Sequence, residues 1–509
     1  YGTVLLASGA VAAGRLGTCV VAVMAPLVVR GVVSALADGS PLRRSWLAGF
    51  GLGVSAAFAP IAWPLAACAA AVGALAFART VGSLLRWLIV VAVPAVVLLP
   101  WLPALAERTA LWASEPGLTG QGGQLSDPAL SPFAPLLLHS GGPGSLAPGV
   151  LAGLTVLGVA ALVLAPGRRV IVAWVLAATA IAAAVLVSRT LVSTPAGEGS
   201  AAGWPGPAVT VAALGIVAAI VLAADQGTGT LSRGVRLLGA GVAGVTTAVA
   251  LALGLVGSLA DPLVRDDSAL LPLYVAEEAS SPQRPTTLVL RLTGGDDPVV
   301  GHTVVRDDTA RLGDAEVTDP VGAAVMDPIV ADLVAGRGEA SAARLADVGV
   351  RYVFAPPPLD AGLDEALDGQ AGLVRASAPD GGSVWRVEGV TGRVRLLDAD
   401  GGAVDVVPSG RIDVDADIDA PTARVVALAE VADPGWQATV DGEPLEATTH
   451  SGDLQAFVLT DGTGRLEITY THPNRSTLLT TQAVLLAVVV VLMLPAASRR
   501  RDSLVGDEL

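Results

Sequence analysis

"VIVAWVLAATAIAAAVLVS", residues 170–188, is an unbroken apolar run that directly follows Arg168 and Arg169. A transmembrane α-helix needs about 20 consecutive apolar residues, and this run reaches that length without a charged residue. The composition agrees, because 52% of the 509 residues are hydrophobic and only 15% are charged, against about 25% in an average soluble domain. We therefore expect an integral membrane protein.

Further apolar runs predict a polytopic α-helical membrane protein with about nine transmembrane helices. The stretch 46–78 is too long for one helix and is interrupted by Pro60 and Pro64, so we expect two short helices with a turn between them. The remaining predicted spans are 16–37, 86–105, 149–166, 207–224, 237–258 and 477–496.

The positions of the arginines predict the orientation. The clusters are Arg43 with Arg44, Arg79 with Arg86, Arg168 with Arg169, Arg233 with Arg236, and Arg499 to Arg501. Threading about nine spans from an outside start places every cluster on the same side. Because short loops rich in arginine stay in the cytoplasm, we expect the chain in the cell membrane with residues 259–476 on the extracytoplasmic side.

Residues 259–476 have the composition of a water-soluble, acidic domain. They hold 37 of the 46 acidic residues and 16 of the 31 basic residues, a net charge of −21. The rest of the chain therefore holds 9 acids and 15 bases, a net charge of +6. A nucleic-acid partner requires a basic face, so this charge argues against nucleic acid and leaves the lipid bilayer as the evident partner.

The soluble segment divides into two predicted parts. Over 259–390, short strands such as "TTLVLRL" (286–292) alternate with helical stretches, which predicts an α/β subdomain. Over 391–476, alternating strands and the turn pairs Asp441-Gly442 and Asp461-Gly462 predict an antiparallel β-sandwich. The predicted organisation is completed by a multi-span region at 1–258 and by a final helix with a basic cytoplasmic tail at 477–509.

Three stretches of this soluble segment carry a resemblance. "DPGWQATVDGEPL" (433–445) and "QAFVLTDGTGRLEITYTHP" (455–473) are similar to the membrane-proximal β-domain of YfhO-like membrane proteins. "LADVGVRYVFAP" (345–356) resembles a strand in the exported domains of such proteins and of GT-C glycosyltransferases.

The whole layout, with "GAVAAGRLGT" (9–18) at its start, resembles the C-terminal membrane portion of family 2 glycosyltransferase fusion proteins from high-GC Gram-positive bacteria. The resemblance implies a cytoplasmic catalytic domain upstream of Tyr1, whose nucleotide-sugar and metal-binding motif is absent from this sequence. It also implies polyprenyl-linked sugar and envelope glycan as partners. Whether the membrane portion is itself an enzyme, a hexosyltransferase, stays open.

Candidate catalytic residues lie in the long predicted loop 106–148. GT-C enzymes use an acidic residue in an exported loop as a general base, and Asp127 and Glu115 are the candidates here. Arg108, at the start of the loop, could pair with a donor phosphate. The alternative interpretation of "SDPALSPFAP" around Asp127 is a plain surface turn.

Trp436 is a candidate for substrate binding, because its ring could stack on a sugar. A tryptophan that follows Pro-Gly at the start of a strand is also typical of a core anchor, which is the alternative. The acidic strand "DVDADID" (413–419) is interpreted as a solvated edge strand. The four histidines lack metal-ligand spacing, so neither a metal site nor a cofactor is expected.

Three functions remain. The first is the membrane portion of a glycosyltransferase in cell-envelope glycan assembly, acting with lipid-linked sugars. The second is a non-catalytic membrane anchor with an exported scaffold or glycan-binding domain. The third is a transporter or flippase. The absence of ionisable residues from the centres of the predicted spans argues against this third function.

Overall fold

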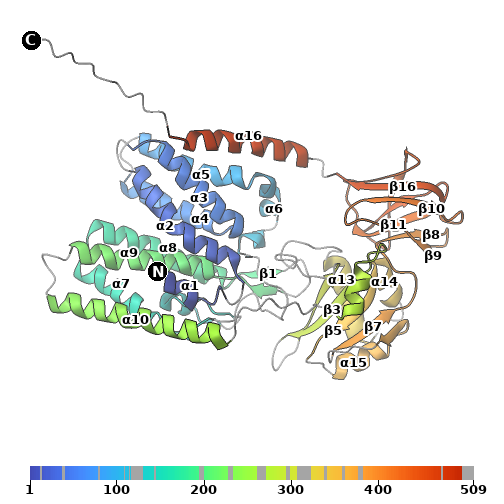
Figure 1. The fold of residues 1–509 in the computed structure, drawn as a ribbon, viewed down its shortest axis with the longest axis horizontal. Helices are drawn as coiled ribbons and strands as arrows, with labels where there is room; N and C mark the ends of the chain where they lie inside the picture. The colour runs from blue at the N-terminus through green and yellow to red at the C-terminus, as the bar shows by residue number, and fades with distance from the viewer. Residues whose placement is uncertain are drawn as a thin grey trace, which may run out of the picture.

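A computed structural model of the chain divides into a helical bundle and a part built on β-sheets (Figure 1). The structure describes residues 1–11, 14–36, 40–77, 81–107, 109–113, 115, 130–142, 145–193, 200–226, 233–260, 271–293, 299–306, 323–336, 341–357, 361–376, 382–471 and 474–495. All structural statements below concern these residues.

The bundle consists of eleven described helices with a few short connecting elements. The helices are α1 (Gly2–Ala7), α2 (Leu16–Leu36), α3 (Arg43–Phe58), α4 (Ala62–Phe77), α5 (Val81–Val97), α6 (Leu102–Glu107), α7 (Ala152–Leu164), α8 (Arg168–Val187), α9 (Gly206–Gln226), α10 (Arg233–Ala260) and α16 (Arg475–Met493). Between them lie the 3-10 turns η1 (Leu99–Trp101), η2 (Thr109–Trp112) and η3 (Ala134–Leu137), and a hairpin of β1 (Leu191–Ser193) and β2 (Ser200–Ala202).

Five helices of the described chain are long and apolar enough to cross a membrane: α2, α8, α9, α10 and α16. A sixth candidate is the pair formed by α5 with η1 and α6, which is bent by 69°. The expectation of a polytopic α-helical membrane protein is therefore met in this coarser form. Three other predicted spans coincide with α3, α4 and α7, which have 16, 16 and 13 residues. At 1.5 Å per residue these helices measure about 20–24 Å, less than the roughly 30 Å of a hydrocarbon core.

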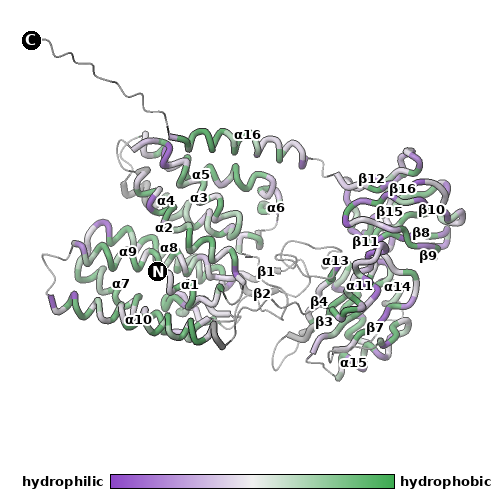
Figure 2. The backbone as a smooth tube through the Cα atoms, viewed as in Figure 1, coloured by the Kyte–Doolittle hydropathy of each residue, from purple (hydrophilic) through white to green (hydrophobic). Residues whose placement is uncertain are grey.

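Small residues let the central helices approach one another closely. A Cβ atom on Gly215 of α9 would lie 2.8 Å from the carbonyl oxygen of Ala173 on α8, so only glycine fits there. Helix α9 is central, with 61% of its span buried, whereas α16 is outermost with 6% buried. Figure 2 shows that hydrophobic residues, drawn in green, predominate along the helices of the bundle. This arrangement is typical of membrane bundles, where small side chains bring helices together.

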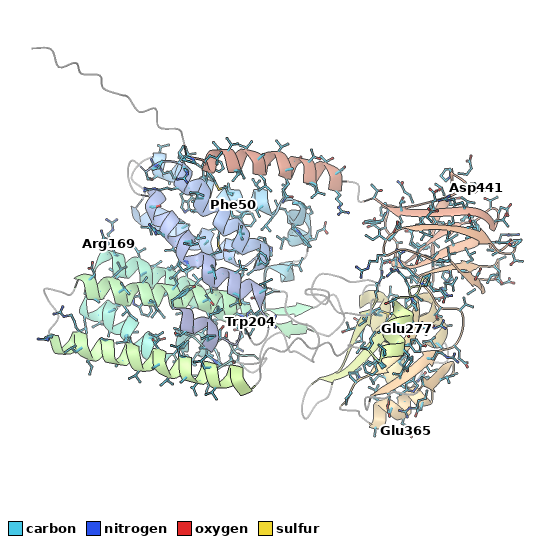
Figure 3. The ribbon with its side chains drawn as sticks, viewed as in Figure 1. Phe50, Arg169, Trp204, Glu277, Glu365 and Asp441 are labelled. Carbon is cyan, nitrogen blue, oxygen red and sulfur yellow. The ribbon has the colours of Figure 1, made fainter. Side chains whose placement is uncertain are left out.

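Three helices begin with an arginine at the end of the bundle away from the sheets. Helices α3, α8 and α10 begin at Arg43, Arg168 and Arg233, and Figure 3 shows the neighbouring Arg169 at that far end. Arg43 Nε also donates a 2.6 Å hydrogen bond to the carbonyl oxygen of Met493, the last residue of α16. The β-rich part is attached to the opposite ends, after α10 and before α16 (Figure 1).

The first soluble module is a mixed sheet covered by helices on both faces. Its strands are ordered β4-β3-β5-β7-β6, with β3 and β5 parallel and the other pairs antiparallel. The elements are α11 (Leu273–Ala279), β3 (Thr286–Thr293), β4 (Val299–Val305), α13 (Ala323–Val334), α14 (Ser341–Asp347), β5 (Val350–Ala355), α15 (Ala361–Asp368), β6 (Leu373–Ala376) and β7 (Ser383–Val387). Because side chains alternate along a strand, Leu288 and Leu290 of β3 pack with α13, α14 and α15, and Val289 packs with α11.

The second module is a sandwich of two antiparallel sheets. One sheet has the order β10-β16-β12-β13 and the other β14-β15-β11-β8-β9. The strands are β8 (Val394–Leu397), β9 (Ala403–Val406), β10 (Val414–Asp419), β11 (Val425–Val431), β12 (Trp436–Val440), β13 (Glu443–Pro444), β14 (Glu446–His450), β15 (Leu454–Val458) and β16 (Thr463–Tyr470). Leu396 and Phe457 from one sheet meet Ile418, Leu466 and Ile468 from the other in a common core.

The two predicted Asp-Gly turns differ. Asp441 and Gly442 have φ values of 49° and 84° and join β12 to β13, as a type I′ hairpin requires. Gly462 instead lies where the chain passes from one sheet to the other, between β15 and β16. Its carbonyl accepts the amide of Ala420, and a Cβ atom would lie 1.8 Å from the Ala420 oxygen. The glycine is required by this close approach of two backbones.

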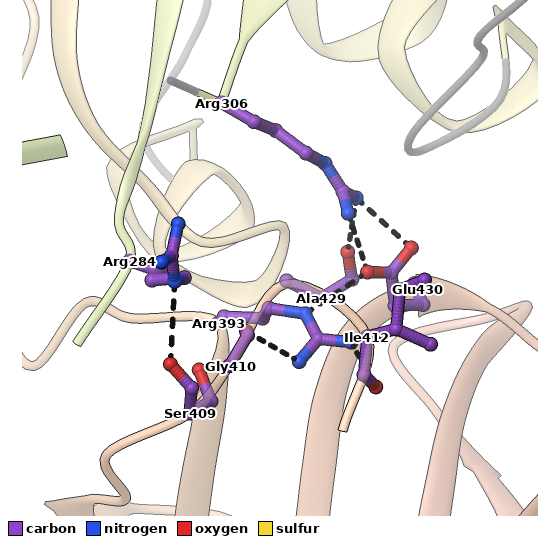
Figure 4. A network of polar contacts seen from close by, with 8 residues as sticks. All are labelled: Arg284, Arg306, Arg393, Ser409, Gly410, Ile412, Ala429 and Glu430. Atoms are coloured by element: carbon purple, nitrogen blue, oxygen red, sulfur yellow. Dashed lines mark hydrogen bonds and ion pairs between the residues drawn. The ribbon is translucent and has the colours of Figure 1, made fainter. Parts of the chain in front are cut away.

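Arg306 and the buried Arg393 share the carboxylate of Glu430 where the two modules meet (Figure 4). Arg393 donates to Glu430 Oε1 at 3.2 Å and to the carbonyl oxygens of Gly410 and Ile412. Arg306, which follows β4 in the first module, binds the same carboxylate at 2.5 and 2.9 Å. Burial lowers the pKa of Arg393, and the Glu430 charge opposes that shift.

A second contact between the modules uses the carboxylate of Asp347, at the end of α14. Arg395 donates to it at 2.8 Å, and Ser451 and His450 of the sandwich contact it as well. Leu454 of β15 is buried in the core of the first module. The two modules are therefore packed as one unit. We call this unit, made of the described residues between 271 and 471, the soluble unit.

Candidate functional site

Of the residues proposed from the sequence, Glu115 and Trp436 lie in the described chain, whereas Arg108 and Asp127 lie outside it. The two described candidates belong to different parts of the molecule. Glu115 is buried in the helical bundle, and Trp436 begins a strand of the sandwich. Glu115 is the centre of a buried polar cluster with Thr18, Arg15 and Trp204. The candidate site is built around this cluster.

The Glu115 carboxylate closes the N-terminal end of α2. Oε1 accepts the backbone N–H of Thr18 at 2.5 Å, and Oε2 accepts the Thr18 hydroxyl at 2.6 Å. The first amides of a helix have no partner within the helix, and a carboxylate that binds them also interacts favourably with the helix dipole. Glu115 thus performs a capping role, although it lies 97 residues along the chain from Thr18.

Gly17 makes this close approach possible. A Cβ atom at this position would lie 2.4 Å from the carbonyl oxygen of Phe58 and 2.9 Å from Glu115 Cγ. Any side chain would therefore push the loop off the helix end. The short stretch Arg15–Leu16–Gly17–Thr18 supplies the guanidinium, the space and the hydroxyl that the carboxylate needs.

Trp204 and Arg15 complete the cluster. The indole N–H of Trp204 donates to the Thr18 hydroxyl at 2.9 Å, so that hydroxyl accepts from Trp204 while it donates to Glu115. Arg15 Nη1 donates to the backbone oxygen of Glu115 at 3.0 Å, and its guanidinium lies 4.9 Å from the Trp204 ring. Gly206 lies against the indole, because a Cβ there would be 2.2 Å from Trp204 Nε1.

Burial dominates the electrostatics of Glu115. The residue is 2% exposed, and burial raises the pKa of its carboxyl to about 7, against the opposing effects of the Thr18 hydrogen bonds and the Arg15 charge. A carboxyl with such a pKa changes its charge near neutral pH. In this arrangement both oxygens are engaged, so a substrate hydroxyl would have to displace Thr18 before Glu115 could accept its proton.

The cluster lies at the end of the bundle to which the soluble unit is attached. Helix α8 begins at Arg168 at the far end and finishes at Val187, after which the β1–β2 hairpin leads to Trp204. Figure 3 shows Trp204 on the side of the sheets and Arg169 on the opposite side. The site therefore faces the soluble unit and is remote from the arginine-bearing helix ends.

Sequence reasoning selected Glu115 and missed its three main partners. Arg15 and Thr18 lie within the quoted stretch "GAVAAGRLGT" (9–18), which was the available signal. Trp204 had no comparable signal, because a tryptophan in a loop between two apolar runs is also typical of a membrane interface.

Trp436 lies at the margin of the sandwich core, where its ring is half-buried against the hydrophobic cluster. It packs on Tyr470 with a ring-centroid distance of 4.8 Å and an interplanar angle of 58°. The Arg393 guanidinium lies 5.7 Å from the centre of the indole. Trp436 thus packs against the core with one part of its ring and exposes the other part to solvent.

Within the described chain, no group of three or more His, Cys, Asp or Glu side chains is arranged to hold a metal ion. Strand β10 is an edge strand whose Asp415 binds Arg465 of β16 through two 2.7 Å hydrogen bonds. This carboxylate is therefore engaged in a cross-strand ion pair. Comparison with protein families, with curated proteins and with solved structures finds no match for the chain.

Proposed function

We propose that this chain is the membrane portion of a glycosyltransferase that assembles cell-envelope glycan from lipid-linked sugar. In this proposal the helical bundle, with about nine membrane-crossing segments, holds the polyprenyl chain of the donor. The soluble unit is extracytoplasmic and presents the acceptor glycan. The arginines that begin α3, α8 and α10 support this orientation, because they lie at the helix ends opposite to the soluble unit and arginine-rich ends stay in the cytoplasm.

The observation that carries the proposal is the Glu115 cluster at the end of the bundle beside the soluble unit. A donor embedded in the bilayer and an acceptor outside it can meet only at such an end. The cluster holds part of the predicted loop 106–148 against α2, with Arg15 next to it. We assign Glu115 the role of positioning this loop, since Thr18 binds both of its carboxylate oxygens. The general base, if this portion is catalytic, is then Asp127.

Two alternatives have an observation in their favour. The raised pKa of Glu115 suits a general base, because a base works best when its pKa is near the working pH. The hydrogen bonds of Thr18 to both carboxylate oxygens of Glu115 instead suit a non-catalytic membrane anchor. The exported domain would then be a scaffold for chemistry carried out elsewhere. A transporter has no comparable support.

Three variants separate these possibilities in a strain that lacks the native protein, with sugar transfer to envelope glycan as the readout. Glu115→Gln keeps a side chain that can cap α2 but cannot act as a base, Glu115→Ala removes both functions, and Asp127→Asn tests the other carboxylate. A positioning role predicts that Glu115→Gln stays active and Glu115→Ala does not. A base role predicts a loss of about 10²–10⁴-fold in Glu115→Gln as well.

The control is Glu107→Gln, which changes an exposed carboxylate at the end of α6. Each variant is compared at equal membrane abundance, so that a folding defect is not counted as a catalytic one. Full transfer activity in all three test variants would contradict chemistry in this loop. The scaffold alternative would then be the better description of the chain.

A further inference from the structure

One end of the sandwich carries the chain into α16. Strand β12 begins at Trp436 and strand β16 ends at Tyr470, and these two residues are directly paired across the sheet. The next residue, Thr471, donates its backbone N–H to the carbonyl oxygen of Gly435 at 2.8 Å. The hydrogen bonds of the sandwich therefore extend to Thr471, three positions before Asn474 at the start of α16.

This end of the sandwich presents partly exposed apolar side chains. The indole of Trp436 and the ring of Tyr470 stack on each other and are both half-buried. Ile412 is 56% exposed, and its carbonyl oxygen accepts a 3.0 Å hydrogen bond from Arg393, whose guanidinium also contacts the Trp436 ring. We call Ile412, Trp436 and Tyr470 the aromatic end.

The length of α16 determines how far the aromatic end can lie from the membrane. Its 19 residues rise by about 28 Å at 1.5 Å per residue, nearly the whole of a hydrocarbon core of roughly 30 Å. Helix α16 is thus too short to extend beyond the membrane and separate the sandwich from it. Arg475, at its first position, must therefore lie at the membrane surface. The three residue-to-residue steps from Thr471 to Asn474 can bridge at most about 11 Å.

We infer that the aromatic end lies in the lipid headgroup layer and holds the soluble unit against the bilayer surface. Tryptophan and tyrosine are favoured in this layer because their rings are apolar while their N–H and O–H groups reach water. The net charge of −21 on residues 259–476 gives the unit no electrostatic attraction to anionic lipid. Contact through apolar side chains is therefore expected to be independent of salt and to occur on zwitterionic lipid.

The inference does not rest on the proposed glycosyl transfer, because it follows from helix length and from the position of these side chains alone. It also holds for either orientation of the chain. If it is right, the soluble unit has one fixed face toward the membrane. The turn at Asp441, which Figure 3 shows at the end of the sandwich away from the helices, then points into the aqueous phase.

The test uses the full chain in phosphatidylcholine nanodiscs with a single environment-sensitive fluorophore. Cys19→Ser and Cys68→Ser remove the native thiols, and Ile412→Cys places the probe on the aromatic end. Glu443→Cys is the matched control, since it is an exposed position on the same sheet next to the distal Asp441 turn. Lipids that carry a spin label on the headgroup serve as quenchers.

We expect headgroup spin labels to cause a marked loss of emission from the probe at position 412 and little loss at position 443, in low and high salt alike. Equal, weak quenching at both positions would overturn the inference. So would a probe at 412 that is shielded from water but not quenched, since protein would then cover this end. Ile412 is largely exposed, so its substitution is compatible with folding, and circular dichroism of the labelled chain verifies this.

Discussion

The buried carboxyl of Glu115 predicts a loss of stability as the pH rises toward neutrality. Burial raises its pKa from the ordinary 4.5 to about 7 in the folded chain. An acid with a raised pKa binds its proton more tightly in the folded state than in the unfolded state. Its contribution to stability is therefore complete below pH 4.5 and is lost as the pH rises through 7. Glu115→Gln, which carries no titratable group, removes this dependence.

The size of the effect follows from the shift. The difference between 7 and 4.5 is about 2.5 pKa units, and each unit corresponds to about 1.36 kcal/mol, which gives roughly 3 kcal/mol. The residue is almost fully buried, so solvent screening removes little of this energy. We expect the free energy of unfolding of the native chain to fall by roughly 3 kcal/mol more than that of Glu115→Gln between pH 4.5 and pH 8.

The assay is unfolding by SDS in mixed micelles, followed by circular dichroism at several pH values. All other titrating groups are the same in the two proteins, so the difference between their pH profiles isolates Glu115. Glu107→Gln, in which an exposed carboxylate is changed, should follow the native profile. Parallel profiles for the native chain and Glu115→Gln would refute the reasoning, because they would show that Glu115 titrates alike in both states.

Two further changes test other parts of the structure. Arg393→Ala removes a buried guanidinium from Glu430 and two carbonyl oxygens. It should lower the free energy of unfolding of the soluble unit by about 3–5 kcal/mol. Arg465→Ala, at an exposed ion pair, is the control, and an equal effect of the two substitutions would contradict the importance of burial. In a cysteine-free background, an impermeant maleimide should label Glu443→Cys in intact cells and Leu42→Cys only after permeabilisation, and the reverse pattern would contradict an extracytoplasmic soluble unit.

The sequence predicts the positions of the helices well, because a long apolar run in a membrane has to satisfy its backbone hydrogen bonds within itself and therefore forms a helix. Pro60 lies in the break between α3 and α4, whereas Pro64 lies in the first turn of α4. Arginines begin α3, α8 and α10, whose first residues lie at one end of the bundle. The sequence does not predict which helices are long enough to span a bilayer. Helices α3 and α7 end two residues before Pro60 and Pro166, respectively, and are therefore shorter than the apolar runs that contain them.

The candidate site was only half predictable. Glu115 was selectable from its chemistry and its place in a long loop, but its partners lie up to 100 residues away in the chain. The buried arginines of the soluble unit were less predictable still. Arg393 and Arg395 alternate with apolar residues in "RVRLL", a pattern that normally indicates a solvent-facing side of a strand. Here the first module covers that side and supplies Asp347, so only the tertiary structure shows that they are buried.

Helix α16 also determines the order in which the molecule can be assembled during synthesis. The ribosome makes the other bundle helices first, then the whole soluble unit, and α16 last. Until then, the side of α3 and α5 against which α16 packs is not covered by that helix. Arg43 then binds the backbone oxygen of Met493, and Gln482 binds that of Val97. These polar contacts distinguish the native packing position of α16 from other positions on the surface of the bundle. A chain that ends before Arg475 would thus have a soluble unit attached to the bundle at one end only, and its bundle would lack the helix that covers α3 and α5.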